Sequence, residues 1–350
     1  QAEDGIRDRS PSRGLGDVYK RQLQTLVNCD VEVCFGNPGT SEMHFVAALD
    51  SVPQMRSVLC LFEGVVTGAA DGYGRVAGKP AATLLHLGPG LANGLANLHN
   101  ARRASTPLVN IVGDHATYHL QYDAPLTSDI VGFARPVSAW IHESKSADAV
   151  AADAARAVQA ARSAPGCVST LILPADTAWN EAQRAEQKLP DLLPTPVSSA
   201  AVDAAARLLS NGRKTALLLR GAALYGAGLE AAGRVQAKTG ARLLCDTFAP
   251  HAELGAGRVP VERIPYFAEQ IVDFLKEIEQ IILVGAKPPV SFFAYPGKPS
   301  WCVPEGSHLS YLAHAHQDGA QALAVLADTL GAPARSPVRI PLQLPELPGG

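Results

Sequence analysis

The sequence lacks the cysteine spacing of a metal site or of a disulfide framework. Its six cysteines stand at positions 29, 34, 60, 167, 245 and 302, and no two of them form a CxxC pair. Zinc sites and disulfide-rich domains depend on such closely spaced or regularly spaced cysteines. We therefore expect reduced thiols in a cytoplasmic protein, and we predict no metal site in this chain.

Long apolar runs and an excess of charge of one sign are missing as well. Every apolar run is broken by Gly, Pro or a charged residue, so none approaches the roughly 20 apolar residues that a membrane-spanning helix needs. Charged residues make up 18% of the chain and the formal net charge is only -3. This balance predicts a protein that binds neither nucleic acid nor a membrane and whose ligand is a small molecule.

The chain does have length and a regular alternation of patterns. Its 350 residues suit two domains of roughly 100–200 residues each. From Leu23 onward, short β-rich runs alternate with Ala-rich helical stretches, a rhythm typical of parallel sheets with crossover helices. The sequence therefore predicts an α/β protein with two doubly wound parallel-sheet domains. The predicted strands are residues 31–35, 57–61, 81–87, 108–112, 168–173, 215–219, 241–245 and 280–284.

Changes in composition predict the domain boundaries. Residues 1–22 are rich in Arg, Asp and Ser and look foreign to the rest of the chain, so we predict a non-native leader there. We expect a first α/β domain at 23–182 and a central α/β domain at 195–332, separated by a polar stretch that contains prolines. Residues 333–350 carry repeated prolines, which is typical of a linker, and we expect the chain to stop between domains.

The most informative segment lies at the end of the second predicted strand and reads Leu-Phe-Glu-Gly at 61–64. Ligands favour this edge of an open α/β sheet. A glutamate in the first turn of a helix is ordinarily an exposed residue that the helix dipole stabilises. Here Phe62, Val65 and Val66 are expected to surround the carboxylate, which would raise its pKa, whereas the helix N-terminus would lower it. The pattern predicts that Glu63 is a carboxylate with a tuned pKa.

Three motifs carry a resemblance to one enzyme family. Phe62-Glu63 with the run AADGYGR at 69–75 resembles the pyrimidine-binding domain of thiamine-diphosphate enzymes, a family that contains acetolactate synthase and benzoylformate decarboxylase. The run FGNPGT at 35–40 is similar to the family's first strand-to-helix loop, and GPG at 88–90 followed by Asn93 is similar to its third. The likeness is clear from about residue 31 to 130 and weaker up to about 330.

The resemblance implies an enzyme that uses thiamine diphosphate to act on 2-oxo acids. In the family, the glutamate at the position of Glu63 hydrogen-bonds a ring nitrogen of the aminopyrimidine and favours its reactive imino form, so Glu63 is implied to be catalytic. We expect the glycines of the two loops to let the backbone approach a ring closely and to tolerate a positive φ. The implied cofactor-binding residues are Gly36, Asn37, Pro38, Gly39, Glu63, Gly88, Pro89, Gly90 and Asn93.

Two further residues are candidates for contact with the substrate. His86 resembles the active-site histidine of benzoylformate decarboxylase, which gives or takes a proton near the reacting carbon, so a catalytic role is implied. A histidine at the end of a strand can equally be structural. Thr40 matches a serine that contacts the substrate in the same decarboxylase, but a helix N-cap explains a threonine there as well.

The sequence departs from both well-known activities of the family. Acetolactate synthases carry a loop that reads Asp-Ala-Phe-Gln-Glu, whereas residues 123–127 read DAPLT and place Leu126 where the glutamine would be. Benzoylformate decarboxylase has an Arg-His-Pro motif, and the matching residues here are Arg263-Ile264-Pro265. We expect an acetolactate synthase-like enzyme that joins decarboxylation to carboligation. A benzoylformate-type decarboxylase is the alternative.

A Gly-Asp-Gly motif with a downstream Asn-Asn pair is absent, and in the family these residues bind diphosphate and magnesium. The resemblance therefore implies the front part of an enzyme, inactive alone, whose Mg²⁺ comes through a missing domain and which is a homodimer or homotetramer when full length. An Arg-Phe-Asp-Asp segment that accompanies FAD in acetolactate synthases is not matched, so FAD has little support. The rival from another class is a non-catalytic nucleotide-binding α/β protein.

Overall fold

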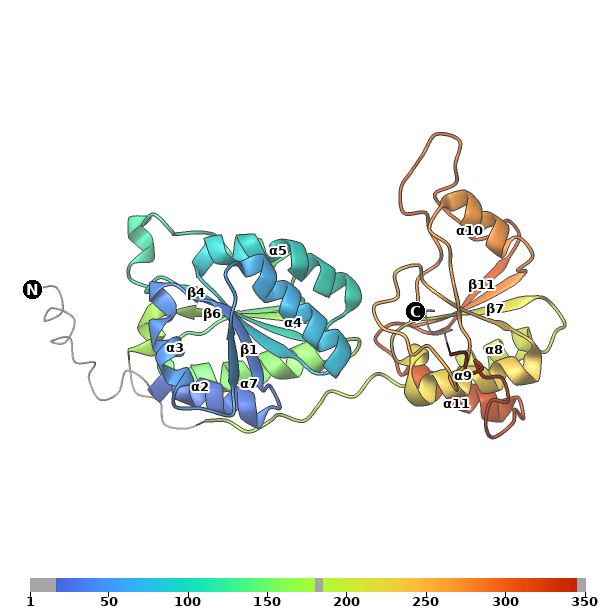
Figure 1. The fold of residues 1–350 in the computed structure, drawn as a ribbon, viewed down its shortest axis with the longest axis horizontal. Helices are drawn as coiled ribbons and strands as arrows, with labels where there is room; N and C mark the ends of the chain where they lie inside the picture. The colour runs from blue at the N-terminus through green and yellow to red at the C-terminus, as the bar shows by residue number, and fades with distance from the viewer. Residues whose placement is uncertain (1–16, 180–184, 345–350) are drawn as a thin grey trace, which may run out of the picture. The chain divides into compact units, whose positions relative to one another are not determined.

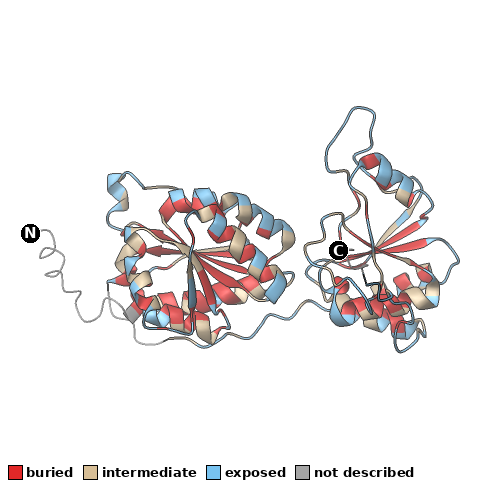
Figure 2. Cartoon of the chain, in the orientation of Figure 1, coloured by how far each residue is buried: buried red, intermediate tan, exposed pale blue. Residues whose placement is uncertain are grey.

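The computed structural model describes residues 17–179 and 185–344, and the chain divides into two compact units after Leu193 (Figure 1). Each unit is a parallel sheet with helices on both faces, and the buried residues lie between the sheet and the helices (Figure 2). The predicted fold, with two doubly wound parallel-sheet domains, is confirmed. Most of the predicted leader, part of the boundary stretch and the last six residues of the predicted linker lie outside the described residues. No helix in the described ranges is long and apolar enough to cross a membrane.

The first unit contains a six-stranded parallel sheet with the order β2-β1-β3-β4-β6-β5. The chain starts at β1, moves outward to β2, and then returns to the other side of β1 to form β3. The junction between β1 and β3 is therefore the topological switch point, where open α/β sheets bind their ligands. The strands are β1 (Val33–Asn37), β2 (Arg56–Leu59), β3 (Ala81–Leu85), β4 (Leu108–Asp114), β5 (Trp140–Glu143) and β6 (Val168–Pro174).

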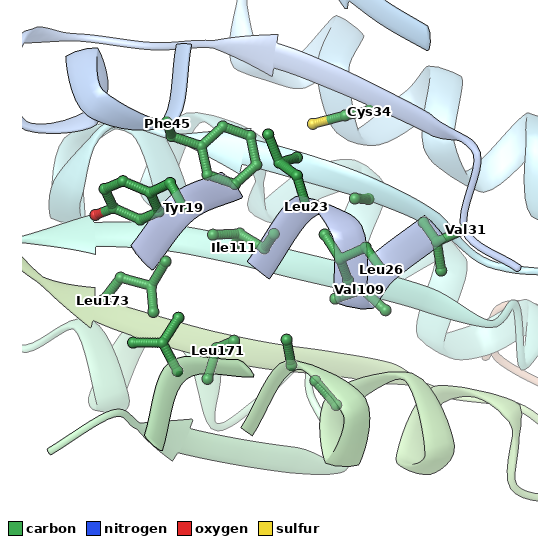
Figure 3. Packing of buried hydrophobic residues seen from close by; sticks show 14 of the residues in the cluster. Tyr19, Leu23, Leu26, Val31, Cys34, Phe45, Val109, Ile111, Leu171 and Leu173 are labelled. Carbon is green, nitrogen blue, oxygen red and sulfur yellow. The ribbon is translucent and has the colours of Figure 1, made fainter. Parts of the chain in front are cut away.

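Helices cover both faces of this sheet. One face is covered by the two long helices α2 (Asp17–Asn28) and α7 (Ala147–Arg162) and by the short helix α3 (Met43–Leu49). Leu23, Leu26 and Phe45 pack there against strand residues such as Ile111 and Leu171 (Figure 3). The opposite face is covered by α4 (Glu63–Ala77), α5 (Leu87–Ala104) and α6 (Ile130–Ala134). Both faces of the central strands β3, β4 and β6 are thus buried, as expected for parallel strands covered by helices on both sides.

The second unit repeats this arrangement on a smaller scale. Its five parallel strands have the order β11-β10-β7-β8-β9. They are β7 (Thr215–Leu219), β8 (Arg242–Cys245), β9 (Glu262–Arg263), β10 (Gln280–Val284) and β11 (His308–Ala313). One face packs against α8 (Ser199–Leu209), α9 (Gly226–Thr239) and α11 (Gly319–Thr329), and the other against α10 (Ala268–Leu275).

Two predicted boundaries need correction. Helix α2 begins at Asp17, and Val18, Tyr19 and Gln22 are buried, so the leader cannot extend to residue 22. Its polar composition concealed a helix with one apolar face. Residues 333–344 are not a free linker either, because Ser336 donates its backbone N–H to the carboxylate of Glu230 on α9 at 2.8 Å.

Replacing Tyr19 with alanine tests whether the start of α2 belongs to the folded unit. Tyr19 packs edge-on against Phe45, with ring centroids 5.6 Å apart. We expect Tyr19→Ala to lower the free energy of unfolding by about 3–5 kcal/mol, because a buried aromatic side chain is lost. Lys20→Ala is the control at the exposed neighbouring position and should change it by less than about 0.5 kcal/mol. Chemical denaturation measures both, and equal effects would contradict the corrected boundary.

Candidate active site

The loops after β1 and β3 meet the start of α4 at the switch point of the first sheet. The side-chain amide of Asn37, the last residue of β1, donates a hydrogen bond at 2.7 Å to the carbonyl of Cys60, the residue after β2. Helix α4 then begins at Glu63, with Phe62 as its N-cap. The fold therefore brings the first predicted loop close to the predicted catalytic glutamate.

Glu63 lies half-buried at the N-terminus of α4. Its Oε2 accepts a hydrogen bond at 3.1 Å from the side-chain amide of Asn93 on α5, so two of the predicted site residues are in contact. The expected apolar enclosure is only partly present. Val66 is fully buried, but the side chains of Phe62 and Val65 are 50% and 55% exposed. They point away from the packed interior because they occupy the outer side of α4, and thus the sequence overestimated the desolvation of Glu63 by this unit.

Close packing of α4 against α5 holds this arrangement. The side-chain amide of Asn97 donates to the Gly64 carbonyl at 2.7 Å, and the Thr67 hydroxyl donates to the Gly94 carbonyl at 3.0 Å. A Cβ added to Gly94 would lie 2.9 Å from Cγ2 of Thr67, closer than carbon atoms approach each other in folded proteins. The absence of a side chain at position 94 thus allows the two helices to approach, which sets the start of α4 opposite the first turns of α5.

The predicted third loop is in fact the first turn of a helix. Residues 88–90 lie within α5, and the sharp turn from β3 into that helix is made at Leu87, whose φ is 52°. Gly36, Gly39, Gly88 and Gly90 do not adopt the positive φ that was expected of them. Steric reasons explain only two of the four, Gly39 and Gly88, which lie where the chain approaches other side chains.

Gly39 and Gly88 are required by their neighbours. A Cβ at Gly39 would overlap the imidazole ring of His86, and a Cβ at Gly88 would overlap the side chain of Ser128. A Cβ at Gly36 would meet only ordinary contacts, the nearest at 3.5 Å. Glycine is therefore required by packing at positions 39 and 88, whereas the packing of this unit does not require it at position 36.

Gly90 lies between the two predicted catalytic residues. A Cβ at this position would come within 3.5 Å of both Oε1 of Glu63 and Cβ of His86. Its contacts are ordinary ones, so packing alone does not demand glycine here. The missing side chain leaves room for about one carbon atom, next to Oε1 of Glu63 and close to Cβ of His86.

His86 is paired with a buried carboxylate that the sequence did not indicate. Nδ1 of His86 lies 2.7 Å from Oε2 of Glu42, and the same oxygen accepts the backbone N–H of Gly39 at 2.9 Å. Glu42 is only 2% exposed, and burial raises the pKa of its carboxyl group. The one available signal was its position three residues after Gly39, which is typical of a helix capping box. That pattern predicts a cap, not a partner for a histidine 44 residues away.

The remaining predicted residues lie around this pair. Thr40 is exposed and is the first residue of a short 3₁₀ helix, whose N-cap is Gly39, so the N-cap explanation of Thr40 is wrong. Pro38 is half-buried and Pro89 is exposed. In the described part of the chain, no group of three or more His, Cys, Asp or Glu side chains could hold a metal ion.

The fold and this geometry define a doubly wound domain with a helix-starting carboxylate and a Glu–His pair at its switch point. Comparison with known proteins shows which family this domain resembles. Residues 18–133 match the model of the thiamine pyrophosphate enzyme N-terminal TPP binding domain, thiamine pyrophosphate being another name for thiamine diphosphate. That segment belongs to this domain family, and the chain is a relative of thiamine-diphosphate-dependent enzymes.

Individual relatives agree with this assignment. A Mycobacterium tuberculosis protein, provisionally named acetolactate synthase large subunit IlvX, is 52% identical over 330 residues, which cover 94% of this chain and 63% of the relative. A benzoylformate decarboxylase of Pseudomonas aeruginosa is 32% identical over 56% of this chain and 37% of its own length. The chain thus spans less than two thirds of the curated relatives that it matches here.

A solved structure shares the fold. The thiamine diphosphate-dependent 4-hydroxybenzoylformate decarboxylase of Rhodococcus jostii RHA1 superposes with a TM-score of 0.75 and 21% sequence identity. The match covers 95% of this chain and 66% of that protein. Both α/β units are therefore included in the likeness.

The burial of Glu42 leads to a pH-dependent difference in stability. Its pKa is raised in the folded state, so the folded protein binds this proton more tightly than the unfolded chain, and the contribution of Glu42 to stability falls as the pH rises above about 4. Glu42→Gln lacks this titration. We expect the free energy of unfolding of the variant, relative to the native chain, to increase as the pH rises above about 4. His86 and Tyr19 are the titratable neighbours that face Glu42.

Glu32→Gln provides a control of opposite sign. Hydrogen bonds from Lys79 and Tyr73 lower the pKa of the exposed Glu32 carboxyl group, so its stabilisation is present above its unfolded pKa and is lost on acidification. Urea titrations at a series of pH values measure both variants. A pH-independent difference for Glu42→Gln would contradict the role of burial.

Proposed function

We propose that this chain is part of a thiamine-diphosphate-dependent enzyme that acts on 2-oxo acids, with Glu63 as the carboxylate that activates the cofactor. The observation that supports this most directly is the position of Glu63. It starts a helix at the switch point, its Oε2 is fixed by Asn93 at 3.1 Å, and its Oε1 borders the open face of Gly90.

The residues present fit the aminopyrimidine end of the cofactor. Oε1 of Glu63 faces Gly90, where no side chain stands in its way, and Cβ of His86 lies equally near that position. A carboxylate beside a helix residue that has no side chain suits a flat ring with nitrogen atoms at its edge, because such a ring can approach the backbone closely. When bound, thiamine diphosphate supplies the nucleophilic carbon and the electron acceptance that decarboxylation of a 2-oxo acid requires.

Glu63 would hold and return one proton at a ring nitrogen. A carboxylate can share a proton reversibly with a weakly basic ring nitrogen, whereas an amide or a hydroxyl is too weak a base to do so. Asn93 donates to Oε2 and so fixes the rotation of the carboxylate, leaving Oε1 as the oxygen that faces Gly90. The family match of residues 18–133 favours this function over a non-catalytic nucleotide-binding protein.

Within this function, an acetolactate synthase-like carboligation is our first proposal, supported by the relative that is 52% identical. The paired His86 favours the second candidate, a benzoylformate-type decarboxylation, because a histidine held beside the reacting carbon could protonate it and release an aldehyde. Product analysis with pyruvate and with benzoylformate distinguishes the two candidates. Carboligation gives a hydroxy-keto acid, whereas simple decarboxylation gives an aldehyde.

Replacing Glu63 with glutamine tests the central proposal. The measurement uses the full-length natural protein that contains these residues, loaded with thiamine diphosphate and Mg²⁺. We expect Glu63→Gln to slow exchange of the thiazolium proton, followed by NMR in D₂O, by about 10²–10⁴-fold, because a proton-transferring group is lost. Glu32→Gln, an exposed carboxylate outside the site, should leave the rate unchanged. An unchanged rate in Glu63→Gln would refute the proposal.

We also propose that a second copy of the chain covers the outer side of α4. Leu61 and Val76, near the two ends of α4, are 91% and 85% exposed, and Phe62 and Val65, beside Glu63, are about half-exposed. Apolar patches of this kind commonly mark protein interfaces. The surface therefore supports a homodimer or homotetramer.

Sedimentation velocity tests this association. We expect the native polypeptide to sediment as an oligomer and Val65→Asp/Val76→Asp to shift toward the monomer, because each new carboxylate would be buried without a partner. Val325→Asp, on the exposed side of α11 in the second unit, is the matched control and should leave the oligomer intact. A native protein that stays monomeric at tens of micromolar would rule out this proposal.

A further inference from the structure

Glu42 is a buried charged residue for which the proposed cofactor chemistry has no use. Its side chain is almost inaccessible, and its two oxygens have different surroundings. Oε2 contacts Nδ1 of His86 and the backbone N–H of Gly39, whereas Oε1 is buried and has no hydrogen-bond partner among the described residues. A buried carboxylate with one unpaired oxygen is costly, so a structural role alone explains it poorly.

The contacts of Oε2 restrict where a proton can reside. Nδ1 of His86 and Oε2 of Glu42 are 2.7 Å apart, a distance that requires one proton between them. Oε2 already accepts the N–H of Gly39, which favours negative charge on that oxygen. A proton on Oε1 would have no acceptor, since that oxygen lies against Gly113, where a Cβ would overlap it. The remaining arrangement places the proton on Nδ1.

The surrounding backbone is shaped to admit this pair. A side chain at Gly39 would displace the imidazole, and a side chain at Gly113 would displace the carboxylate. These two glycines come from the loop after β1 and from β4, while His86 follows β3, which lies between those strands in the sheet. Three strands of the switch point therefore contribute to one Glu–His contact.

We propose that Glu42 is a positioning residue that keeps His86 protonated at Nδ1 and thereby leaves Nε2 as the nitrogen that exchanges a proton with the substrate. The role of Nε2 rests on the proposed function, but protonation at Nδ1 does not. The assignment makes His86 a base through Nε2 when neutral and an acid through the same atom when charged. Without the carboxylate, an imidazole is free to carry its proton on either nitrogen.

NMR of the 350-residue chain without cofactor tests the tautomer directly. The histidines are labelled with ¹⁵N, and long-range ¹H–¹⁵N correlations distinguish Nδ1–H from Nε2–H for each of the ten imidazoles. The signals of His86 are those that disappear in His86→Gln. We expect His86 of the native chain to be in the Nδ1–H form above the pH at which it loses its charge. An Nε2–H form in the native chain would mean that Glu42 donates a proton to His86, and it would overturn the proposal without any variant.

Variants of Glu42 separate positioning from packing. In Glu42→Gln the carboxylate charge is lost at nearly constant volume, and we expect the Nε2–H signal to become at least as strong as the Nδ1–H signal. Glu42→Asp keeps the charge and should restore the Nδ1–H form, which a purely structural role would not require. Glu32→Gln is the control and should leave His86 unchanged. If His86 keeps the Nδ1–H form in Glu42→Gln, the positioning role is refuted.

The outcome is independent of the proposed function. If Glu63→Gln leaves thiazolium exchange unchanged while His86 shows the expected tautomers, the cofactor proposal fails and the Glu42–His86 assignment stands. If exchange depends on Glu63 but the tautomer of His86 does not depend on Glu42, only the positioning role fails.

Discussion

The packing of α4 against α5 is the constraint on which the candidate site depends. Thr67 and Asn97 each donate to a glycine carbonyl of the facing helix, and these bonds can form only because a Cβ is absent where the helices meet. Since α4 begins at Glu63 and α5 follows His86, the helix contact fixes both catalytic candidates at once. A larger residue at Gly94 would separate the helices and move the carboxylate away from Asn93.

The fold was largely predictable from the sequence, and the strands that the sequence did not predict share a physical cause. Strands such as β7 and β10 are buried on both faces, so they read as continuous apolar runs and were predicted at their observed bounds. The unpredicted strands β5, β9 and β11 lie at sheet edges, where one partner strand is missing and polar residues are tolerated. Pattern alone cannot distinguish such strands from loops.

The candidate site was predictable only where it lies within local motifs. Glu63, Gly90 and Asn93 belong to short runs whose spacing is visible in the chain, and the structure brings them together. Glu42 was missed because its importance arises from a contact with His86, formed when β1 and β3 pair across the switch point. The burial of a charge is a tertiary property, and the same residues in the sequence can form either an exposed helix cap or a buried pair with a distant histidine.

Glu42 and Glu63 show two ways in which one sheet edge can use a carboxylate. Glu42 is enclosed by its own unit, so burial raises its pKa and the folded chain bears the cost of that charge. Glu63 borders exposed apolar side chains, Phe62 and Val65, that its own unit leaves uncovered. A surface that covered them would remove water from Glu63 only after assembly. The strength of its hydrogen bond to a bound ring would then depend on the covering partner, because electrostatic interactions strengthen as water is excluded.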